Sequence, residues 1–415
     1  MSDYRYVILG GGMVAGYAAK ELAEKHGLKP GELCVLSDEQ TPPYERPPLS
    51  KDFLTGKVRE DEILISDQAF YRDHGIDLRL GTPVTSVDFD AKALRTDASA
   101  GGVVRYEKLL VATGASPRTL DVPGGNLDGV LYLRSVEDAR RIRERATGGG
   151  EKRVVVIGGG YIGLEASASL KQAGADSVTV VLSGGGLLPR LFTPEMSAFF
   201  RGYYERRGVH FVADARATAF TGDKRVTGVV LDSGRELPAD LVVAGVGVAP
   251  NVALFEHGAL AVDRREGIRV NEYLETSVPD VYAAGDATNY RDVLFDKQRH
   301  VEHWDNAVEG GKHAAAVMAG KREPFVHVPY FFSDEFDLSW EFWGDADGSD
   351  RVVYRGDVDS AKFSAWWLKE KRLVAAFVMN RPDDERDAAP AWIQSRHAPD
   401  PALLEDAGKP LPAPA

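Results

Sequence analysis

The pattern of hydrophobic and polar residues near the N-terminus predicts a strand, a glycine turn, a helix and a second strand, in that order. The run 4–9 is apolar and strand-like, and it leads directly into Gly10-Gly11-Gly12. Apolar residues at helical spacing follow up to residue 26, and 33–36 is predicted to be the next strand. These features together form a strand–turn–helix–strand unit.

The same order recurs in the middle of the chain. A strand is predicted over 154–157, the glycine turn begins at Gly158, a helix is predicted over about 162–173, and 178–182 follows as a strand. Because the two units share their whole layout, we interpret them as an internal repeat of a nucleotide-binding unit.

The glycines of both turns are the residues that a dinucleotide pyrophosphate requires. The phosphates bind at the N-terminus of a helix, where backbone N–H groups and the helix dipole favour negative charge. One glycine permits the tight turn, a second lets the backbone approach the phosphate, and a small third residue lets the helix pack on the strand. The matching residues are Gly10, Gly12 and Ala15 in the first turn and Gly158, Gly160 and Gly163 in the second. Two such turns favour two dinucleotide sites.

The two units differ in the residues that follow their second strands. Asp38 and Glu39 can accept hydrogen bonds from the ribose of an unphosphorylated adenosine. The second unit has only Ser183 and the glycines 184–186 at this point, and Arg190 is the nearest charged residue. The strand end therefore leaves the choice between NADH and NADPH open.

Composition and charge exclude several kinds of partner. The 415 residues are 44% hydrophobic and 27% charged, which is typical of a globular protein, and the net charge of −13 argues against nucleic acid. The longest apolar runs are only strand-sized, so we predict no transmembrane helix and no membrane partner. The first strand begins almost at residue 1, which leaves no room for a signal peptide, and we expect a cytoplasmic protein.

Cys34 is the only cysteine, which excludes an intramolecular disulfide and any multi-cysteine zinc or iron–sulfur site. It lies within an apolar strand, so we expect a buried packing residue rather than a redox nucleophile. No constellation of metal ligands is visible, and no metal is predicted.

Other segments complete the layout. The strand 106–111 ends in Thr113-Gly114, and the strand 281–284 ends in Gly285-Asp286, after which we expect a helix. Short strands rich in aromatic residues are predicted from 329 onward. The proline-rich stretch 399–415 is expected to be a disordered tail. Linkers are expected at 148–150 and 320–322.

These motifs, in this order, resemble the flavoproteins that have two dinucleotide-binding domains. The segment 43–51, Pro-Tyr-Glu-Arg-Pro-Pro-Leu-Ser-Lys, is similar to the signature of their ferredoxin-reductase-like branch. This branch includes reductases of oxygenase systems, apoptosis-inducing-factor relatives and monodehydroascorbate reductases. The likeness is strongest to monodehydroascorbate reductase, and it is carried by 189–193, 203–204, 301–303, 329–333 and 336–340.

The resemblance implies an α/β fold with two Rossmann-like domains, in which the NAD domain is inserted into the FAD domain, and a C-terminal α+β interface domain. The implied bounds are 1–115 and 245–320 for FAD binding, 116–244 for NAD(P) binding, 321–398 for the interface domain and 399–415 for the tail.

The resemblance also implies the site. Lys51 and Glu165 would be the catalytic pair at the flavin, where the cation stabilises the negative charge that arrives with a hydride. The implied FAD contacts are Gly10, Gly12, Ala15, Glu39, Arg46, Lys51, Val84, Thr113, Gly114, Arg134, Asp286 and Phe332. The implied NAD(P) contacts are Gly158, Gly160, Tyr161, Ile162, Gly163, Glu165, Arg190, Gly247, Glu302 and His303.

The chain departs from monodehydroascorbate reductases at four positions. Gly184 replaces an acid that reads the NADH ribose in the plant enzymes, Val308 replaces an arginine for the ascorbyl substrate, and Phe332 and Asp334 replace a tyrosine and an arginine. An anionic substrate requires a cation or a hydrogen-bond donor, which these residues lack. We therefore expect weak activity with the ascorbyl radical, and we expect Val308→Arg to raise it.

The sequence thus predicts an enzyme that passes electrons from NAD(P)H, with a modest preference for NADH, through FAD to a one-electron acceptor. The first candidate acceptor is a small carrier such as a ferredoxin or rubredoxin. The second is a small organic radical or a quinone, as in monodehydroascorbate reductase. A non-catalytic alternative is a redox-sensing protein like the apoptosis-inducing-factor relatives.

Overall fold

The computed structural model describes residues 2–97, 102–148, 152–256 and 258–412. The chain divides into two compact units. Unit 1 contains Met1–Glu45, Asp61–Ser116 and Val248–Pro329, and unit 2 contains Arg46–Glu60, Pro117–Gly247 and Tyr330–Ala415. The predicted linker residues Gly149 and Gly150 and the last three residues of the predicted tail lie outside the described residues.

A seven-stranded sheet forms the centre of unit 1. Its order is β3-β2-β1-β6-β5-β4, and β19 pairs with β6. The strands are β1 (Ser2–Leu9), β2 (Leu33–Leu36), β3 (Asp77–Arg79), β4 (Val84–Asp88), β5 (Ala93–Thr96), β6 (Val103–Val111) and β19 (Val281–Ala283). Strands β3, β2, β1, β6 and β19 run parallel, whereas β4 and β5 form an antiparallel edge. Parallel strands are covered on both faces, which explains why 33–36, including Cys34, is fully buried.

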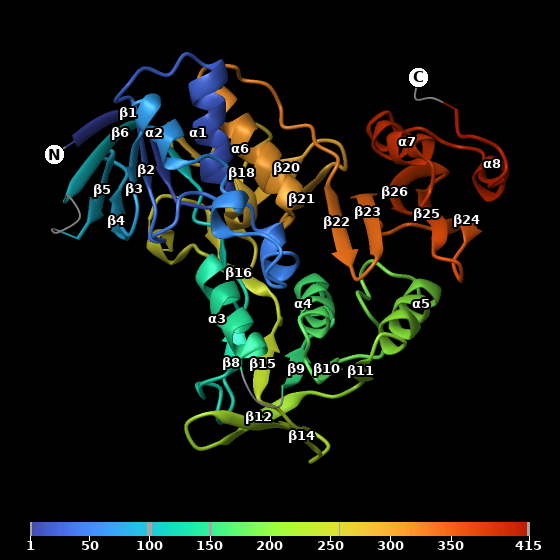
Figure 1. The fold of residues 1–415 in the computed structure, drawn as a ribbon. Coiled ribbons are helices and arrows are strands. Elements are labelled where there is room, and N and C mark those ends of the chain that lie inside the picture. Colours follow the sequence, from blue (N-terminus) through green and yellow to red (C-terminus); the bar gives the residue numbers. More distant parts are fainter. Residues whose placement is uncertain (1, 98–101, 149–151, 257, 413–415) are drawn as a thin grey trace. The chain divides into compact units, whose positions relative to one another are not determined.

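Helices α1 (Met13–Lys25) and α6 (Trp304–Met318) pack side by side in unit 1 (Figure 1). A Cβ atom on Gly311 would lie 2.7 Å from the backbone oxygen of Val14, so the glycine lets the two helices approach closely. Unit 1 also contains α2 (Gln68–Asp73) and two short 3-10 turns, η2 (Glu60–Ile63) at its border and η4 (Ala253–Phe255). Strands β7 (Ala115–Pro117) and β16 (Val248–Pro250) form a two-stranded sheet.

The helix expected directly after Gly285-Asp286 is absent there. A single 3-10 turn, η5 (Gly285–Ala287), is followed by a strand, β20 (Thr288–Asp292). This strand belongs to a four-stranded sheet with β17 (Val262–Asp263), β18 (Gly267–Val270) and β21 (Lys297–Arg299). The prediction was wrong because β20 pairs with β18, which precedes it in the chain, and with β21, which follows it. This strand pairing overrides the local helix propensity.

The central part of unit 2 is a five-stranded parallel sheet of order β11-β10-β9-β15-β8. Its strands are β8 (Val130–Tyr132), β9 (Arg153–Ile157), β10 (Ser177–Val181), β11 (Val209–Val212) and β15 (Leu241–Ala244). Helices α3 (Val136–Thr147), α4 (Tyr161–Gln172) and α5 (Pro194–Glu205) connect them. An antiparallel sheet of β12 (Ala217–Gly222), β13 (Val226–Leu231) and β14 (Glu236–Pro238) is inserted before β15.

The C-terminal part of unit 2 is an antiparallel sheet of order β22-β23-β26-β25-β24. The strands are β22 (Tyr330–Glu335), β23 (Leu338–Gly344), β24 (Arg351–Asp357), β25 (Lys362–Lys369) and β26 (Arg372–Met379), and helix α7 (Asp383–Gln394) packs on β26. Most of the aromatic side chains here are buried, as the alternating pattern predicts.

The tail expected to be disordered is ordered as far as residue 412. It contains a short helix, α8 (Pro401–Glu405), and it buries Leu404 and Leu411. The buried guanidinium of Arg355 forms an ion pair of 2.7 Å with Glu385 and donates a hydrogen bond of 3.0 Å to the carbonyl of Leu403. Two leucines and one arginine thus anchor a segment whose prolines suggested disorder.

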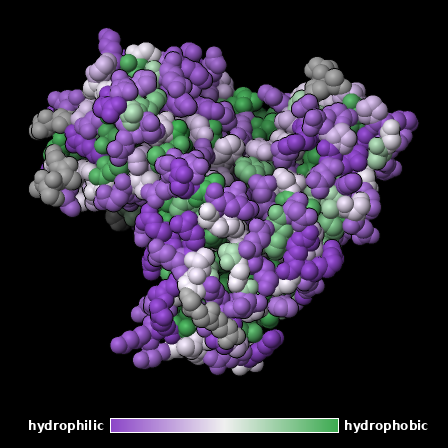
Figure 2. Space-filling view, viewed as in Figure 1, coloured by the Kyte–Doolittle hydropathy of each residue, from purple (hydrophilic) through white to green (hydrophobic). Residues whose placement is uncertain are grey.

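Hydrophilic residues predominate on the face seen in Figure 2, in keeping with the net charge of −13. Among the residues that the structure describes, no helix is both long and apolar enough to cross a bilayer.

Candidate functional site

The first glycine turn, in unit 1, connects β1 to α1. Gly10 has a φ angle of +129°, and a Cβ atom on it would lie 2.1 Å from the carbonyl oxygen of Ala112, so only glycine fits. Gly12 is the N-cap of α1, the first turn of the helix has no side-chain cap and no acidic residue, and Ala15 is fully buried. The first backbone N–H groups of α1 are therefore oriented to bind an anion.

Glu39 follows β2 at the same end of the sheet. Its carboxylate accepts a hydrogen bond of 2.6 Å from the hydroxyl of Tyr44, and its backbone N–H donates to Ser37 Oγ at 3.1 Å. These contacts hold the acid beside the first glycine turn, where a ribose acceptor is required.

Three further segments of unit 1 carry predicted FAD contacts. Thr113 and Gly114 follow β6, and Thr113 Oγ1 donates to the carbonyl of Asn251 at 2.8 Å. Asp286 lies in η5 and is nearly buried, and Val84 begins β4.

Glu302 and His303 precede α6. Glu302 is exposed and shares a hydrogen bond of 2.9 Å with His300, and His303 is the N-cap of α6. Burial, reinforced by nearby Arg299, lowers the pKa of His303 to about 4, so its ring is neutral at pH 7. One contact here was missed from the sequence, since the Trp304 indole donates to Glu45 at 2.6 Å and ties the start of α6 to the signature loop.

The second glycine turn, in unit 2, connects β9 to α4 and repeats the first. Gly158 has a φ angle of +110°, and a Cβ atom on it would lie 2.2 Å from the carbonyl oxygen of Gly245. A Cβ on Gly160 would meet no atom within 4 Å, which leaves open space at the N-cap of α4. The helix has no side-chain cap and no acid in its first turn. By contrast, Ser135 and Thr193 cap α3 and α5 with their side chains.

The remaining predicted NAD(P) contacts lie around this turn. Gly163 packs against the backbone of Gly158, and Gly247 follows β15 with a φ angle of +92°. Tyr161 makes an edge contact with Phe331, with ring centroids 4.8 Å apart, whereas Ile162 is 41% exposed.

An acid that the local sequence did not reveal lies beside the residues that follow β10. Arg190 is exposed, and Gly184 has open space around its Cβ position. A Cβ on Gly185 would lie 3.8 Å from a carboxylate oxygen of Asp214, which follows β11, the strand beside β10. Asp214 lies 29 positions after Gly185 in the chain, so only the pairing of the two strands shows this proximity.

Lys51 and Glu165 form an ion pair of 2.7 Å in unit 2, with side chains 12% and 5% exposed. Ser50 also donates a short hydrogen bond to Glu165. Lys51 Nζ lies 5.3 Å from the ring centroid of Phe332, and Arg46 donates to the backbone carbonyl of Arg134. The structure thus contains the pairing that the resemblance implies, although its chemical role stays a prediction.

A second acid, Glu335, lies behind this pair and was not predicted. Ser333 Oγ lies 2.6 Å from Glu165 Oε1 and 3.2 Å from Glu335 Oε1, so it bridges the two carboxyl groups. Burial, followed by the charge of Glu165, raises the pKa of Glu335 to about 7, although the polar groups of Tyr204, Trp340 and Ser333 oppose the rise.

Val308 corrects one expectation from the sequence. It is 4% exposed and belongs to the hydrophobic core of unit 1. An arginine at this position would bury an unpaired cation, which is destabilising. The expected gain of activity in Val308→Arg is therefore not supported.

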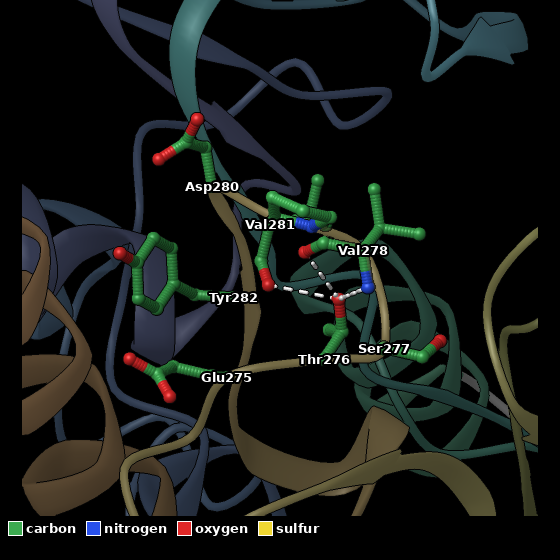
Figure 3. Close-up of a pocket in the computed structure, with 8 residues that line it drawn as sticks. Glu275, Thr276, Ser277, Val278, Asp280, Val281 and Tyr282 are labelled. Carbon is green, nitrogen blue, oxygen red and sulfur yellow. Dashed lines mark hydrogen bonds between the residues drawn. The ribbon is translucent and has the colours of Figure 1, made fainter.

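A pocket in unit 1 does not belong to the candidate site. It is formed by the loop 275–282 that leads into β19, and Figure 3 shows that the Thr276 hydroxyl makes its hydrogen bonds within this loop. None of the residues that line it is a predicted site residue.

Two strand–glycine-turn–helix units with uncapped helices, together with a buried lysine–glutamate pair, fit a protein that binds two dinucleotides. Residues 4–311 match the family model described as pyridine nucleotide-disulphide oxidoreductase, and residues 330–414 match the one described as reductase C-terminal. The chain belongs to the pyridine nucleotide-disulphide oxidoreductase family. The predicted branch and fold class are confirmed by these matches and by the relatives below.

Relatives of this chain include several plant enzymes. Peroxisomal monodehydroascorbate reductase 4 of Arabidopsis thaliana is 40% identical over 413 residues, which cover 95% of this chain and 83% of the relative. Monodehydroascorbate reductase of Pisum sativum is 39% identical over 412 residues, which cover 93% of each protein.

Solved structures of electron-transfer reductases are similar along nearly the whole chain. A ferredoxin reductase from Rhodopseudomonas palustris has a TM-score of 0.91 and 34% identity, covering 97% of this chain and 98% of that chain. Putidaredoxin reductase in its covalent complex with putidaredoxin has a TM-score of 0.92 and 32% identity, covering 99% and 97%. This family member is therefore an NAD(P)H-dependent flavin oxidoreductase, as predicted.

Proposed function

We propose that the chain binds FAD non-covalently at the first glycine turn and NADH at the second, and that electrons leave singly for an external acceptor. The observation that carries this proposal is the shared geometry of the two turns, because α1 and α4 each begin at a glycine with neither a side-chain cap nor an acid. The bound flavin would accept a hydride and release single electrons. The FAD domain would comprise 1–115 and 245–320, and the NAD domain 116–244.

We propose for the predicted site residues the roles that the family resemblance implies. Glu39 would accept hydrogen bonds from the FAD ribose, and Asp286 would bind the ribityl–pyrophosphate part. Lys51, held by Glu165, would place a cation at the flavin and stabilise incoming negative charge. The other FAD and NAD(P) contacts named above are proposed with them.

The chemistry expected from the family name does not extend to a disulfide in this chain. Its only cysteine is Cys34, which is fully buried. Burial raises the pKa of the Cys34 thiol to about 12, so thiolate is scarce at pH 7. Electrons would therefore pass directly from the flavin to a separate molecule.

We favour a small redox carrier, such as a ferredoxin or rubredoxin, as the acceptor. One similar structure is a reductase captured with putidaredoxin. An anionic organic radical would require a cation, whereas Phe332 is apolar and Asp334 is an exposed acid. The identity of 36–40% to monodehydroascorbate reductases supports that activity as the second candidate.

Purification and steady-state assays test this proposal. The protein should be yellow, and denaturation should release free FAD. NADH oxidation should be fast with ferricyanide and with an iron–sulfur carrier, and slow with an enzymatically generated ascorbyl radical. A colourless protein that takes up no FAD would contradict the proposal. Equal rates with the radical and the carrier would favour the second candidate, and negligible turnover with every acceptor would favour a redox sensor.

We infer that Asp214 makes the second site prefer NADH over NADPH. Its carboxylate lies beside the glycines that follow β10, where it would repel a 2′-phosphate and attract a ribose hydroxyl. A repulsion of roughly 1 kcal/mol, the size expected for two charges about 4 Å apart in water, corresponds to about fivefold discrimination. Asp214→Asn should lower the ratio of kcat/KM for NADH to that for NADPH by this factor. The exposed Asp232→Asn in the same unit serves as the control, and an unchanged ratio in Asp214→Asn would contradict the inference.

A cytoplasmic location stays a prediction from the sequence, since the relatives include enzymes described as peroxisomal and as cytosolic.

A further inference from the structure

Behind the Lys51–Glu165 pair lies a closed cluster of polar side chains within unit 2. Glu335 and Ser333 come from β22, Tyr204 from α5 and Trp340 from β23, and each is 1% exposed or less. Glu165 on α4 is the member of the cluster that contacts Lys51. Water is excluded from this cluster, so any charge in it must be balanced by the side chains themselves.

The cluster has two carboxyl groups and a single cation. Lys51 Nζ is 2.7 Å from Glu165 Oε1. Among the residues that the structure describes, no Lys, Arg or His lies within ion-pair distance of Glu335. Two buried carboxylates that share a site do not both ionise readily, so one proton is expected to stay in the cluster at neutral pH.

The hydrogen bonds indicate which carboxyl group carries this proton. Glu165 contacts the cation Lys51 and accepts hydrogen bonds from Ser50 and Ser333, so the cation and both donors lie at Glu165. A serine hydroxyl has one proton, and Ser333 lies closer to Glu165 than to Glu335. A protonated Glu335 can then donate to Ser333 Oγ while Ser333 donates to Glu165, so each of these two hydrogen bonds has one donor and one acceptor.

We propose that Glu335 holds this proton and, through Ser333 and Glu165, sets the net charge around Lys51 according to pH. Glu335 is thus a positioning residue that acts through the ion pair, and its effect on the reaction rests on the proposed placement of Lys51 at the flavin. When Glu335 is protonated, Lys51 is balanced by one carboxylate. When Glu335 ionises, a second negative charge weakens the electrostatic attraction that Lys51 offers to incoming electrons.

The groups that face Glu335 are consistent with titration near neutrality. Glu165 on α4 raises the pKa of Glu335, and the hydroxyl of Tyr204 on α5, the indole N–H of Trp340 on β23 and the hydroxyl of Ser333 lower it, with a net value of about 7. Tyr204 stays neutral, because burial and the two acids raise its pKa well above the ordinary value. Glu165 and Tyr204 are thus the titratable groups that act on the pKa of Glu335, and we expect Glu335 to titrate in a single step.

Infrared spectroscopy detects the proton without any turnover. Ordinary carboxyl groups are ionised at pH 6, so the carbonyl stretch of a protonated carboxyl should be visible at pH 6 and disappear with a midpoint near 7. The band should be absent in Glu335→Gln, which keeps the shape of the protonated side chain. It should remain in Glu341→Gln, which removes a carboxylate on β23 that pairs with Arg386. No band in the wild type at pH 6, or a band that survives in Glu335→Gln, would overturn the proposal.

The flavin reduction potential measures the effect on Lys51. In the wild type, a plot of potential against pH should show an additional steepening above the Glu335 midpoint, and Glu335→Gln should lack this additional steepening. Identical plots for both proteins would overturn the coupling. Failure of the proposed function would look different, because a protein without FAD would have no flavin potential but would still show the infrared band.

Discussion

Replacing Glu335 by glutamine should change how the stability of unit 2 depends on pH. In the native protein burial raises the pKa of Glu335 from 4.5 to about 7. Between these values the folded state binds a proton that the unfolded chain has released, so the stabilising contribution is complete below pH 4.5 and is lost as the pH rises to about 7. At about 1.4 kcal/mol for each pKa unit, the loss amounts to about 3 kcal/mol. Because glutamine does not titrate, Glu335→Gln avoids this loss of stability.

Urea unfolding at pH 5, 6, 7 and 8, followed by tryptophan fluorescence, measures this difference. Five of the six tryptophans lie in unit 2, so the signal reports mainly on that unit. Between pH 5 and pH 8, the free energy of unfolding of Glu335→Gln should rise relative to that of the wild type by about 2.5 kcal/mol. Glu341→Gln should show no such divergence. A variant that is less stable than the wild type at pH 8, or a difference that does not vary with pH, would refute the reasoning.

Four other variants test separate parts of the structure. Lys51→Met should slow the reduction of bound flavin by NADH in rapid mixing by about 10- to 100-fold, because it removes a charge-assisted contact. Arg355→Met should lower the free energy of unfolding by about 3–5 kcal/mol and expose residues 400–412 to proteases, because it breaks a buried ion pair. By contrast, the exposed ion pair of Arg351 with Glu405 should contribute less than about 1 kcal/mol to the free energy of unfolding. Asp334→Arg should raise kcat/KM for the ascorbyl radical about tenfold, which corresponds to a decrease of about 1.4 kcal/mol in the activation free energy. By contrast, Val308→Arg should fail to fold stably, because the position is buried. A stable, more active Val308→Arg would contradict the burial of that position.

The glycine turns could be predicted from the sequence because their physics is local. A glycine at a positive φ angle and a helix without a cap follow from a few adjacent residues, and both turns appear where they were expected. The Lys51–Glu165 pair could not be derived this way, because 114 residues separate its partners and only the family likeness indicated it. Local patterns also failed at 399–412, where distant Arg355 supplies the order, and after Asp286, where strand pairing decides the structure.

Asp214 and Glu335 show why the rest of the site was missed. Each is an ordinary acid in the sequence, and its importance depends on what the fold places next to it. Asp214 becomes relevant because β11 pairs with β10, and Glu335 because β22 brings it behind Glu165 through Ser333. No pattern within a window of 10 to 20 residues contains this information.

Side chains on the two faces of β22 have different proposed functions. Side chains on a strand point alternately to opposite faces, and here Ser333 and Glu335 are buried, Phe332 is partly exposed and Asp334 is exposed. The buried side holds the proposed proton, and the open side carries Phe332 and Asp334, two of the four residues that depart from monodehydroascorbate reductases. Asp334→Arg should therefore alter the choice of acceptor without moving the infrared band, and Glu335→Gln should remove the band while preserving the order of acceptors. If either variant changed both properties, the two faces of β22 would be coupled, and the assignment of one role to each face would be wrong.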